Sequence, residues 1–103
     1  MSKWNCIEML VAPGDSSHAR NSEAAVIELL DGRLLLGWSE FYAGEGEDWS
    51  PSHIAMKTSD DGGRTWSEAS VLLENEGKQC TMEVDFLRLP SGDLCLFYCK
   101  KNS

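Results

Sequence analysis

Residues 59–66 read Ser59-Asp60-Asp61-Gly62-Gly63-Arg64-Thr65-Trp66. Paired Asp and Gly residues are typical of a tight turn, because Asp bonds nearby main-chain amides and Gly adopts positive φ without steric cost. In such a turn Asp61 can accept hydrogen bonds from exposed amides, and Trp66 can begin the next strand with its ring packed inward. This stretch therefore predicts a hairpin turn between two strands.

Short apolar segments with strand-like alternation lie on both sides of this turn. Ile54, Met56 and Thr58 alternate with their neighbours before it, and residues 66–73 form a second segment after it. Further upstream, Asp31-Gly32 separates two more apolar segments. The pattern predicts four antiparallel strands over residues 24–30, 33–41, 53–59 and 66–73, and short Gly-punctuated runs of this kind do not fit helices.

The hairpin around Gly32 recurs later in the chain. Leu29-Leu30-Asp31-Gly32-Arg33-Leu34-Leu35-Leu36-Gly37-Trp38 is echoed by Leu89-Pro90-Ser91-Gly92-Asp93-Leu94-Cys95-Leu96-Phe97-Tyr98, so the period is 92 minus 32, or 60 residues. Four strands in a period of this size favour one blade of a β-propeller. A sandwich of short hairpins fits the same strand pattern.

Composition narrows the class of protein. The 103 residues are 42% hydrophobic and 25% charged, with a formal net charge of -8. Only nine Lys and Arg residues are present, and they are scattered, which argues against a nucleic-acid partner. The apolar run at residues 9–12 is too short for a signal-peptide core or a membrane helix, so the chain as written is expected to be soluble and cytoplasmic, without a membrane partner.

The four cysteines are Cys6, Cys80, Cys95 and Cys99. They form no C-x-x-C pair and have no His at the spacing of a zinc site. Consecutive same-face positions along one strand do not bring sulfurs within bonding distance, so Cys95 and Cys99 are not expected to pair. The sequence predicts buried free thiols, no metal site and no cofactor.

Ser59, Asp61, Gly63, Thr65 and Trp66 occupy every fixed position of the Asp-box, S-x-D-x-G-x-T-W. Here the chain resembles the sialidase or neuraminidase superfamily, specifically the bacterial BNR-repeat proteins. The resemblance extends over roughly residues 16–103. It is carried by the two hairpins and the Asp-box, together with Arg20-Asn21-Ser22-Glu23, Ser39-Glu40-Phe41-Tyr42, His53-Ile54-Ala55, Glu74-Asn75-Glu76-Gly77 and Lys101-Asn102-Ser103.

The resemblance implies an all-β fold, an incomplete six-bladed sialidase-like propeller with about one and a half blades of four-stranded antiparallel sheet. Residues 1–15 would be a lead-in strand, 16–80 the first blade, and 81–103 the first hairpin of a truncated second blade. The Asp-box residues are expected to be structural, since the motif also occurs in non-enzymatic propellers. The remaining blades of the parent chain are the expected partner of this segment.

Up-and-down topology places candidate functional groups at one rim. Because successive strands reverse direction, the Asp31-Gly32 turn and the Asp-box turn emerge together, and the longer connections over residues 16–23, 41–52 and 74–83 gather at the opposite rim. Loops on a rigid scaffold commonly carry binding and catalytic groups. Acidic, aromatic, His and Arg side chains are concentrated in these three segments.

Sialidases that this chain resembles bind the sugar carboxylate with arginines, use a Tyr activated by a Glu as nucleophile, and use an Asp as acid and base. By position Arg20 would bind the carboxylate, although Arg20-Asn21-Ser22 stands where the family has Arg-Ile-Pro. Asp48 would be the acid and base, with Glu23 and Glu47 as the next candidates. Trp49 and His53 would contact the sugar.

Each of these roles has a structural alternative. The run Gly44-Glu45-Gly46-Glu47-Asp48 also fits a solvated acidic turn, Trp49 also fits a wedge between loops, and His53 also fits a core strand. The resemblance places the other arginines and the nucleophile in later blades.

Two functions follow from the sequence. The first is the N-terminal part of an exo-acting, sialidase-like glycoside hydrolase that releases terminal sialic acid or a related acidic sugar from glycans. The alternative is a non-catalytic BNR-repeat propeller that binds glycans or proteins.

Overall fold

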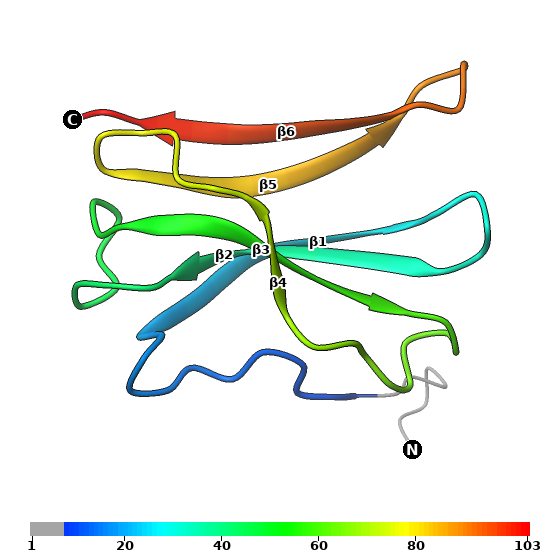
Figure 1. Cartoon of the computed structure of the whole chain (residues 1–103), viewed down its shortest axis with the longest axis horizontal. Helices are drawn as coiled ribbons and strands as arrows, with labels where there is room; N and C mark the ends of the chain where they lie inside the picture. The colour runs from blue at the N-terminus through cyan, green and yellow to red at the C-terminus, as the bar shows by residue number, and fades with distance from the viewer. Residues whose placement is uncertain (1–7) are drawn as a thin grey trace.

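The structure is a computed structural model that describes residues 8–103, and over this range it contains β-strands and no helix (Figure 1). The strands are β1 (Arg20–Glu28), β2 (Leu34–Phe41), β3 (Ser52–Ser59), β4 (Ser70–Leu73), β5 (Cys80–Arg88) and β6 (Leu94–Lys101). They form a four-stranded sheet in the order β1-β2-β3-β4 and a two-stranded sheet of β5 and β6. All neighbouring strands are antiparallel.

The first strand begins earlier than expected. It was predicted from residue 24, but β1 starts at Arg20, because Arg20, Asn21 and Ser22 pair with the end of β2 across the sheet. The polar side chains of these residues do not prevent main-chain pairing. The connection that was expected over residues 16–23 therefore ends at residue 19.

The fourth strand is shorter than expected, since β4 covers Ser70–Leu73 and not residues 66–73. Ser67 accounts for the difference. Its amide donates to the Thr58 carbonyl at 2.9 Å, and its hydroxyl accepts from the Thr58 amide at 2.9 Å, so a side chain replaces one rung of the ladder. Residues 8–15 of the expected lead-in strand form no strand, and residues 1–7 lie outside the described range.

The 60-residue repeat is visible in the strands themselves. Subtracting 60 from the bounds of β5 and β6 gives the bounds of β1 and β2. Both β1 and β5 are interrupted by a bulge, and each bulge holds a glutamate at positive φ, Glu23 at 49° and Glu83 at 63°. The four-stranded and two-stranded sheets are thus the one and a half expected units, with the second unit starting at Cys80.

Strand β5 packs across β1, β2 and β3 of the first sheet. Gly37 permits the close approach, because a Cβ there would lie 3.0 Å from Cζ of Phe86. Phe41, Cys80 and Met82 are buried together between the sheets, where removal of apolar surface from water stabilises the packing. The main core therefore lies between the two units.

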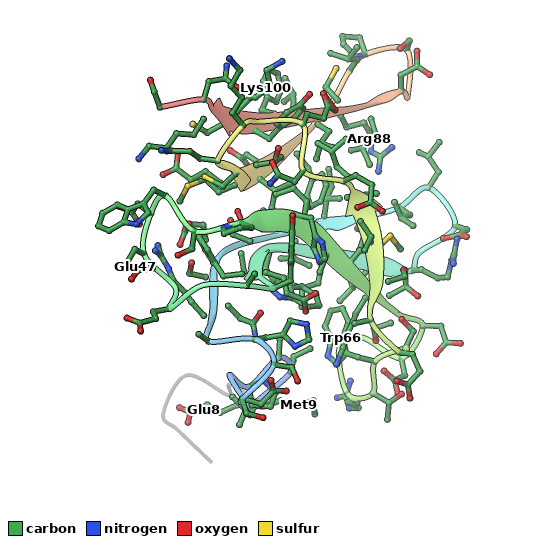
Figure 2. The ribbon with its side chains drawn as sticks, turned by 60° about the vertical axis from the view of Figure 1, so that its left-hand side comes forward. Glu8, Met9, Glu47, Trp66, Arg88 and Lys100 are labelled. Carbon is green, nitrogen blue, oxygen red and sulfur yellow. The ribbon has the colours of Figure 1, made fainter. Side chains whose placement is uncertain are left out.

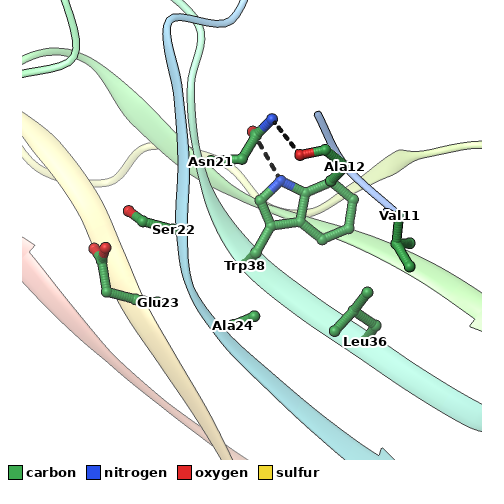
Figure 3. Close-up of a pocket in the computed structure, with 8 residues that line it drawn as sticks. All are labelled: Val11, Ala12, Asn21, Ser22, Glu23, Ala24, Leu36 and Trp38. Atoms are coloured by element: carbon green, nitrogen blue, oxygen red, sulfur yellow. Dashed lines mark hydrogen bonds between the residues drawn. The ribbon is translucent and has the colours of Figure 1, made fainter. Parts of the chain in front are cut away.

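The other face of the first sheet is covered by the segment that precedes β1. Lys57 Nζ donates to the Val11 carbonyl at 2.7 Å, and Asn21 Nδ2 donates to the Ala12 carbonyl at 3.1 Å. The Trp38 indole in turn donates to Asn21 Oδ1 at 3.0 Å, beside a small, mainly apolar pocket (Figure 3). Residues 8–19 thus act as a strap held by side chains of the sheet.

The two rims of the first sheet differ as expected. Leu34 pairs with Ser59, so the β1–β2 turn and the β3–β4 turn lie at the same end. The connections over residues 42–51 and 74–79 lie at the opposite end, on the left of Figure 1. Figure 2 shows Glu47 and Trp66 on opposite sides of the molecule accordingly.

Two of the cysteines differ from the expected buried thiols. Cys80 is buried, but Cys95 is partly exposed and Cys99 is exposed, because β6 is an edge strand and one of its faces is uncovered; all three are free. Cys6 lies outside the described residues. Within residues 8–103 no helix is long and apolar enough to cross a membrane.

Candidate functional site

Arg20 is the centre of the long-loop rim. Its Nε donates to Ser22 Oγ at 2.9 Å, and its terminal nitrogens donate to the Gly46 carbonyl at 3.2 Å, Asp48 Oδ1 at 2.6 Å and Glu23 Oε2 at 3.0 Å. The guanidinium carbon lies 4.6 Å from the centroid of the Phe41 ring, in cation–π geometry. A guanidinium held at its edges and over one face is fixed in orientation.

Glu23 reaches Arg20 because of the bulge in β1. Its φ of 49° lies in the left-handed region, which non-glycine residues occupy only when the surroundings impose it. A bulge re-aims the side chain of the extra residue, and here Glu23 Oε2 is directed at Arg20. The other carboxylate oxygen, Oε1, is buried and has no hydrogen-bond partner within residues 8–103.

Asp48 reaches Arg20 from the loop between β2 and β3. Gly44 and Gly46 adopt positive φ, and the loop is closed by a bond from the Ser50 amide to the Glu47 carbonyl at 2.8 Å. The Asp48 side chain is 63% exposed, whereas that of Glu23 is 26% exposed. The site therefore has one sheltered carboxylate and one carboxylate that faces solvent.

Arg20 and Asp48 shift each other's pKa. The hydrogen bond from Arg20, followed by its charge, lowers the pKa of Asp48, and a smaller effect of the same sign comes from Lys101. The hydrogen bond to Asp48 is likewise the largest cause that raises the pKa of Arg20, ahead of the opposing effect of burial and the contribution of Glu23. Both effects favour the charged forms of the pair.

His53 lies on the other face of the sheet from Arg20. Register pairs Arg20, Phe41 and Ser52 across the sheet, and His53 is one position further along, where side chains point the opposite way. Its Nε2 is 2.8 Å from Glu40 Oε1. Its ring stacks on Tyr42 with centroids 4.8 Å apart.

Trp49 follows Asp48 in the loop and is 61% exposed. The structure thus brings together Arg20, Glu23 and Asp48, but not His53.

Three partners of Arg20 were not expected from the sequence: the Phe41 ring, the Ser22 hydroxyl and the Gly46 carbonyl. Phe41 could have been found from strand pairing, since the register places it opposite Arg20, whereas a main-chain carbonyl carries no sequence signal.

The Asp61 turn lies at the opposite rim. Asp61 Oδ1 accepts from the Thr65 amide at 2.9 Å and from the Ser59 hydroxyl at 2.8 Å, and the Thr65 hydroxyl donates to Oδ2. These bonds, led by the two from Thr65, lower the pKa of Asp61 to about 2. The Trp66 indole donates back to the Gly63 carbonyl at 3.0 Å, which closes the turn.

No group of three or more His, Cys, Asp or Glu side chains within residues 8–103 is arranged to hold a metal ion. The chemistry available at the Arg20 rim is that of a fixed cation and two carboxylates. Such a site can bind an anion and can exchange a proton.

Comparison with known proteins identifies a solved structure with a similar fold. No family model and no curated protein sequence matches the chain. Among solved structures, the chain is similar to the NanB sialidase from Streptococcus pneumoniae in complex with 2-[(3-chlorobenzyl)ammonio]ethanesulfonate, with 27% sequence identity and a TM-score of 0.54. The match covers 82% of this chain and 13% of the NanB chain, so this chain spans a small part of that sialidase. The all-β architecture is that of an incomplete sialidase-like β-propeller.

Proposed function

We propose that this chain is the N-terminal part of an exo-acting glycoside hydrolase of sialidase type, which releases terminal sialic acid or a related acidic sugar from glycans. The observation that carries the proposal is Arg20, a guanidinium fixed at the long-loop rim next to the solvent-facing carboxylate of Asp48. The similarity to a sialidase structure supports it.

Arg20 would bind the carboxylate of the sugar. The planar fork of a guanidinium pairs with a carboxylate through two parallel hydrogen bonds, which selects anionic sugars over neutral ones. The Phe41 ring and the Ser22 hydroxyl hold the fork in place before the ligand arrives. A preorganised group loses less freedom on binding, so affinity is gained without further contacts.

Asp48 would serve as the general acid and base. A carboxylic acid at the rim can protonate the leaving-group oxygen and then accept a proton from the attacking water. Glu23 would position Arg20, because Oε2 of this carboxylate is bonded to the guanidinium. Trp49 would stack on a sugar ring. His53 would stabilise the sheet, because its side chain bonds to that of Glu40 on the neighbouring strand.

The test uses the longer protein that we propose contains this chain, with a fluorogenic sialoside as substrate. Arg20→Ala is expected to lower kcat/KM by roughly tenfold to a hundredfold, the effect of losing charge-assisted hydrogen bonds worth about 1.5–3 kcal/mol. Arg20→Lys is expected to recover only part of the activity, because an ammonium lacks the fork. Arg33→Ala is the matched control: Arg33 lies at the opposite rim, paired with Asp31 at 2.8 Å.

Two outcomes would overturn the proposal. Unchanged sialoside hydrolysis by Arg20→Ala would exclude Arg20 as the carboxylate anchor. Absence of hydrolysis by the parent protein, on sialosides and on other acidic sugars alike, would exclude the enzyme and favour a propeller that binds glycans or proteins.

A further inference from the structure

The hydrogen-bonding capacity of Arg20 is largely used within the chain. Of its five N–H groups, four have acceptors: Ser22 Oγ, the Gly46 carbonyl, Asp48 Oδ1 and Glu23 Oε2. The Phe41 ring lies over one face of the guanidinium. A bidentate ligand carboxylate needs two N–H groups, so it has to displace at least one of these acceptors.

Asp48 is the acceptor that can leave. Ser22 and Glu23 belong to the same strand as Arg20, and the Gly46 carbonyl is main chain. The Asp48 side chain is the most exposed of the three in the Arg20–Glu23–Asp48 cluster, and within residues 8–103 its carboxylate bonds only to Arg20. Rotation of this one side chain therefore opens Arg20 to solvent without a change in the loop backbone.

We infer that a ligand carboxylate takes the place of Asp48 on Arg20, and that Asp48 takes up a proton from solvent as it is displaced. The inference rests on the proposed function and deepens it, because it explains how the acid acquires its proton. In the free protein Asp48 occupies the position of the ligand; with ligand bound, Asp48 carries the proton that the leaving group requires.

The charges around Asp48 give the direction of the proton transfer. Arg20 is the largest cause that lowers the pKa of Asp48, and Lys101 of β6 adds a smaller effect of the same sign. Loss of the Arg20 bond removes the larger effect, and the ligand carboxylate adds a like charge nearby, so the pKa of Asp48 rises on binding.

Among residues 8–103, the exposed Glu45 lies in the same loop as Asp48, and two further carboxylates and one thiol are close to the Arg20–Asp48 pair. Glu23 is bonded to Arg20, and Glu47 precedes Asp48 in the loop with its carboxylate bonded to the Ser50 hydroxyl. Cys80 of β5 donates its thiol to the Asp48 carbonyl at 3.3 Å and carries a pKa raised by burial, so it stays neutral. None of them supplies a cation that would replace Arg20.

The test is calorimetric titration of the longer protein with N-acetylneuraminic acid at several pH values from about 4 to 7, using at each pH two buffers with different ionisation enthalpies. The parent protein is expected to take up a fraction of one proton per bound ligand. Asp48→Asn is expected to bind several-fold tighter, up to about tenfold, since a competitor for the site is weakened, and to take up no proton. Glu45→Gln, which removes a nearby exposed charge without touching Arg20, is expected to behave as the parent.

The outcomes separate this inference from the proposed function. Proton uptake that persists in Asp48→Asn, or weaker binding by that variant, would overturn the inference while leaving a sialidase-type site intact. If N-acetylneuraminic acid does not bind, sialic acid is excluded as the sugar of the proposed function, and sodium acetate then serves as the probe of the displacement. The carboxyl ¹³C resonance of Asp48 has to move toward its protonated position as acetate is added; an unmoved resonance overturns the displacement.

Discussion

The hydroxyl of Ser39 joins the two units of the fold, and its removal is expected to loosen β5. Ser39 is fully buried, with 0% exposure, and its Oγ accepts the amide proton of Glu83 at 2.8 Å. Glu83 is the bulge residue of β5, at a φ of 63°. Ser39→Ala removes the only side-chain acceptor of this amide within residues 8–103 while changing little volume.

The expected cost of Ser39→Ala is that of leaving the Glu83 amide without its hydrogen-bond acceptor. An average intramolecular hydrogen bond contributes about 0.5–1.5 kcal/mol, but a buried donor left without a partner costs about 1–3 kcal/mol. The larger value applies here, because the acceptor is the fully buried Ser39 hydroxyl, so an amide that loses this acceptor still points into the packed contact between the two units. We therefore expect the free energy of opening β5 to fall by about 1–3 kcal/mol in Ser39→Ala.

Native-state hydrogen exchange in the longer protein, followed by mass spectrometry on peptides that cover β5, measures this opening. The expected decrease in this opening free energy corresponds to roughly 5- to 150-fold faster exchange of the β5 amides. Ser52→Ala is the matched control: Ser52 is also fully buried and donates to the Thr81 carbonyl at 2.8 Å. It should have the smaller effect, since an under-satisfied carbonyl is better tolerated than an orphaned amide. Equal effects, or no effect of Ser39→Ala, would refute the reasoning.

Three further predictions concern other parts of the chain. Gly77→Ala should lower the free energy of unfolding by about 1–3 kcal/mol or more, because its Cβ would lie 2.5 Å from the Lys101 carbonyl oxygen and closer still to that of Cys80; an unchanged melting midpoint contradicts this. Asp61, whose folded pKa is about 2 against an ordinary 3.8, stabilises its turn above about pH 4 and loses this effect as the pH falls toward 2, so the protection factor of the Thr65 amide, its exchange rate relative to that of an unstructured peptide at the same pH, should fall over that range in the parent and not in Asp61→Asn; a pH-independent difference argues against the carboxylate. Residues 1–103 expressed alone should aggregate or remain loosely packed, because among the described residues 8–103 β6 pairs only with β5, and Phe97 is 53% exposed; a sharp, concentration-independent melting transition of a monomer would exclude this.

Features that depend on neighbours in sequence could be predicted from the sequence. The turns at Gly32 and Gly63 follow from local chemistry, since Gly takes the positive φ that both turns contain. The 60-residue period and the existence of six strands follow from repeated apolar runs. Strand ends were less accurate: β1 begins at Arg20 because its partner strand supplies hydrogen bonds to polar residues, and no propensity of those residues indicates this.

The tertiary structure decided which candidate residues meet. Arg20 and Asp48 are 28 positions apart and become neighbours through strand register and a closed loop, and Glu23 reaches them through a bulge that no sequence pattern indicated. The same register places His53 on the other face, because a shift of one residue along a strand reverses the direction of every side chain. Local sequence therefore determined the turns and the repeat, which need only short-range contacts, whereas the composition of the site was decided by long-range pairing.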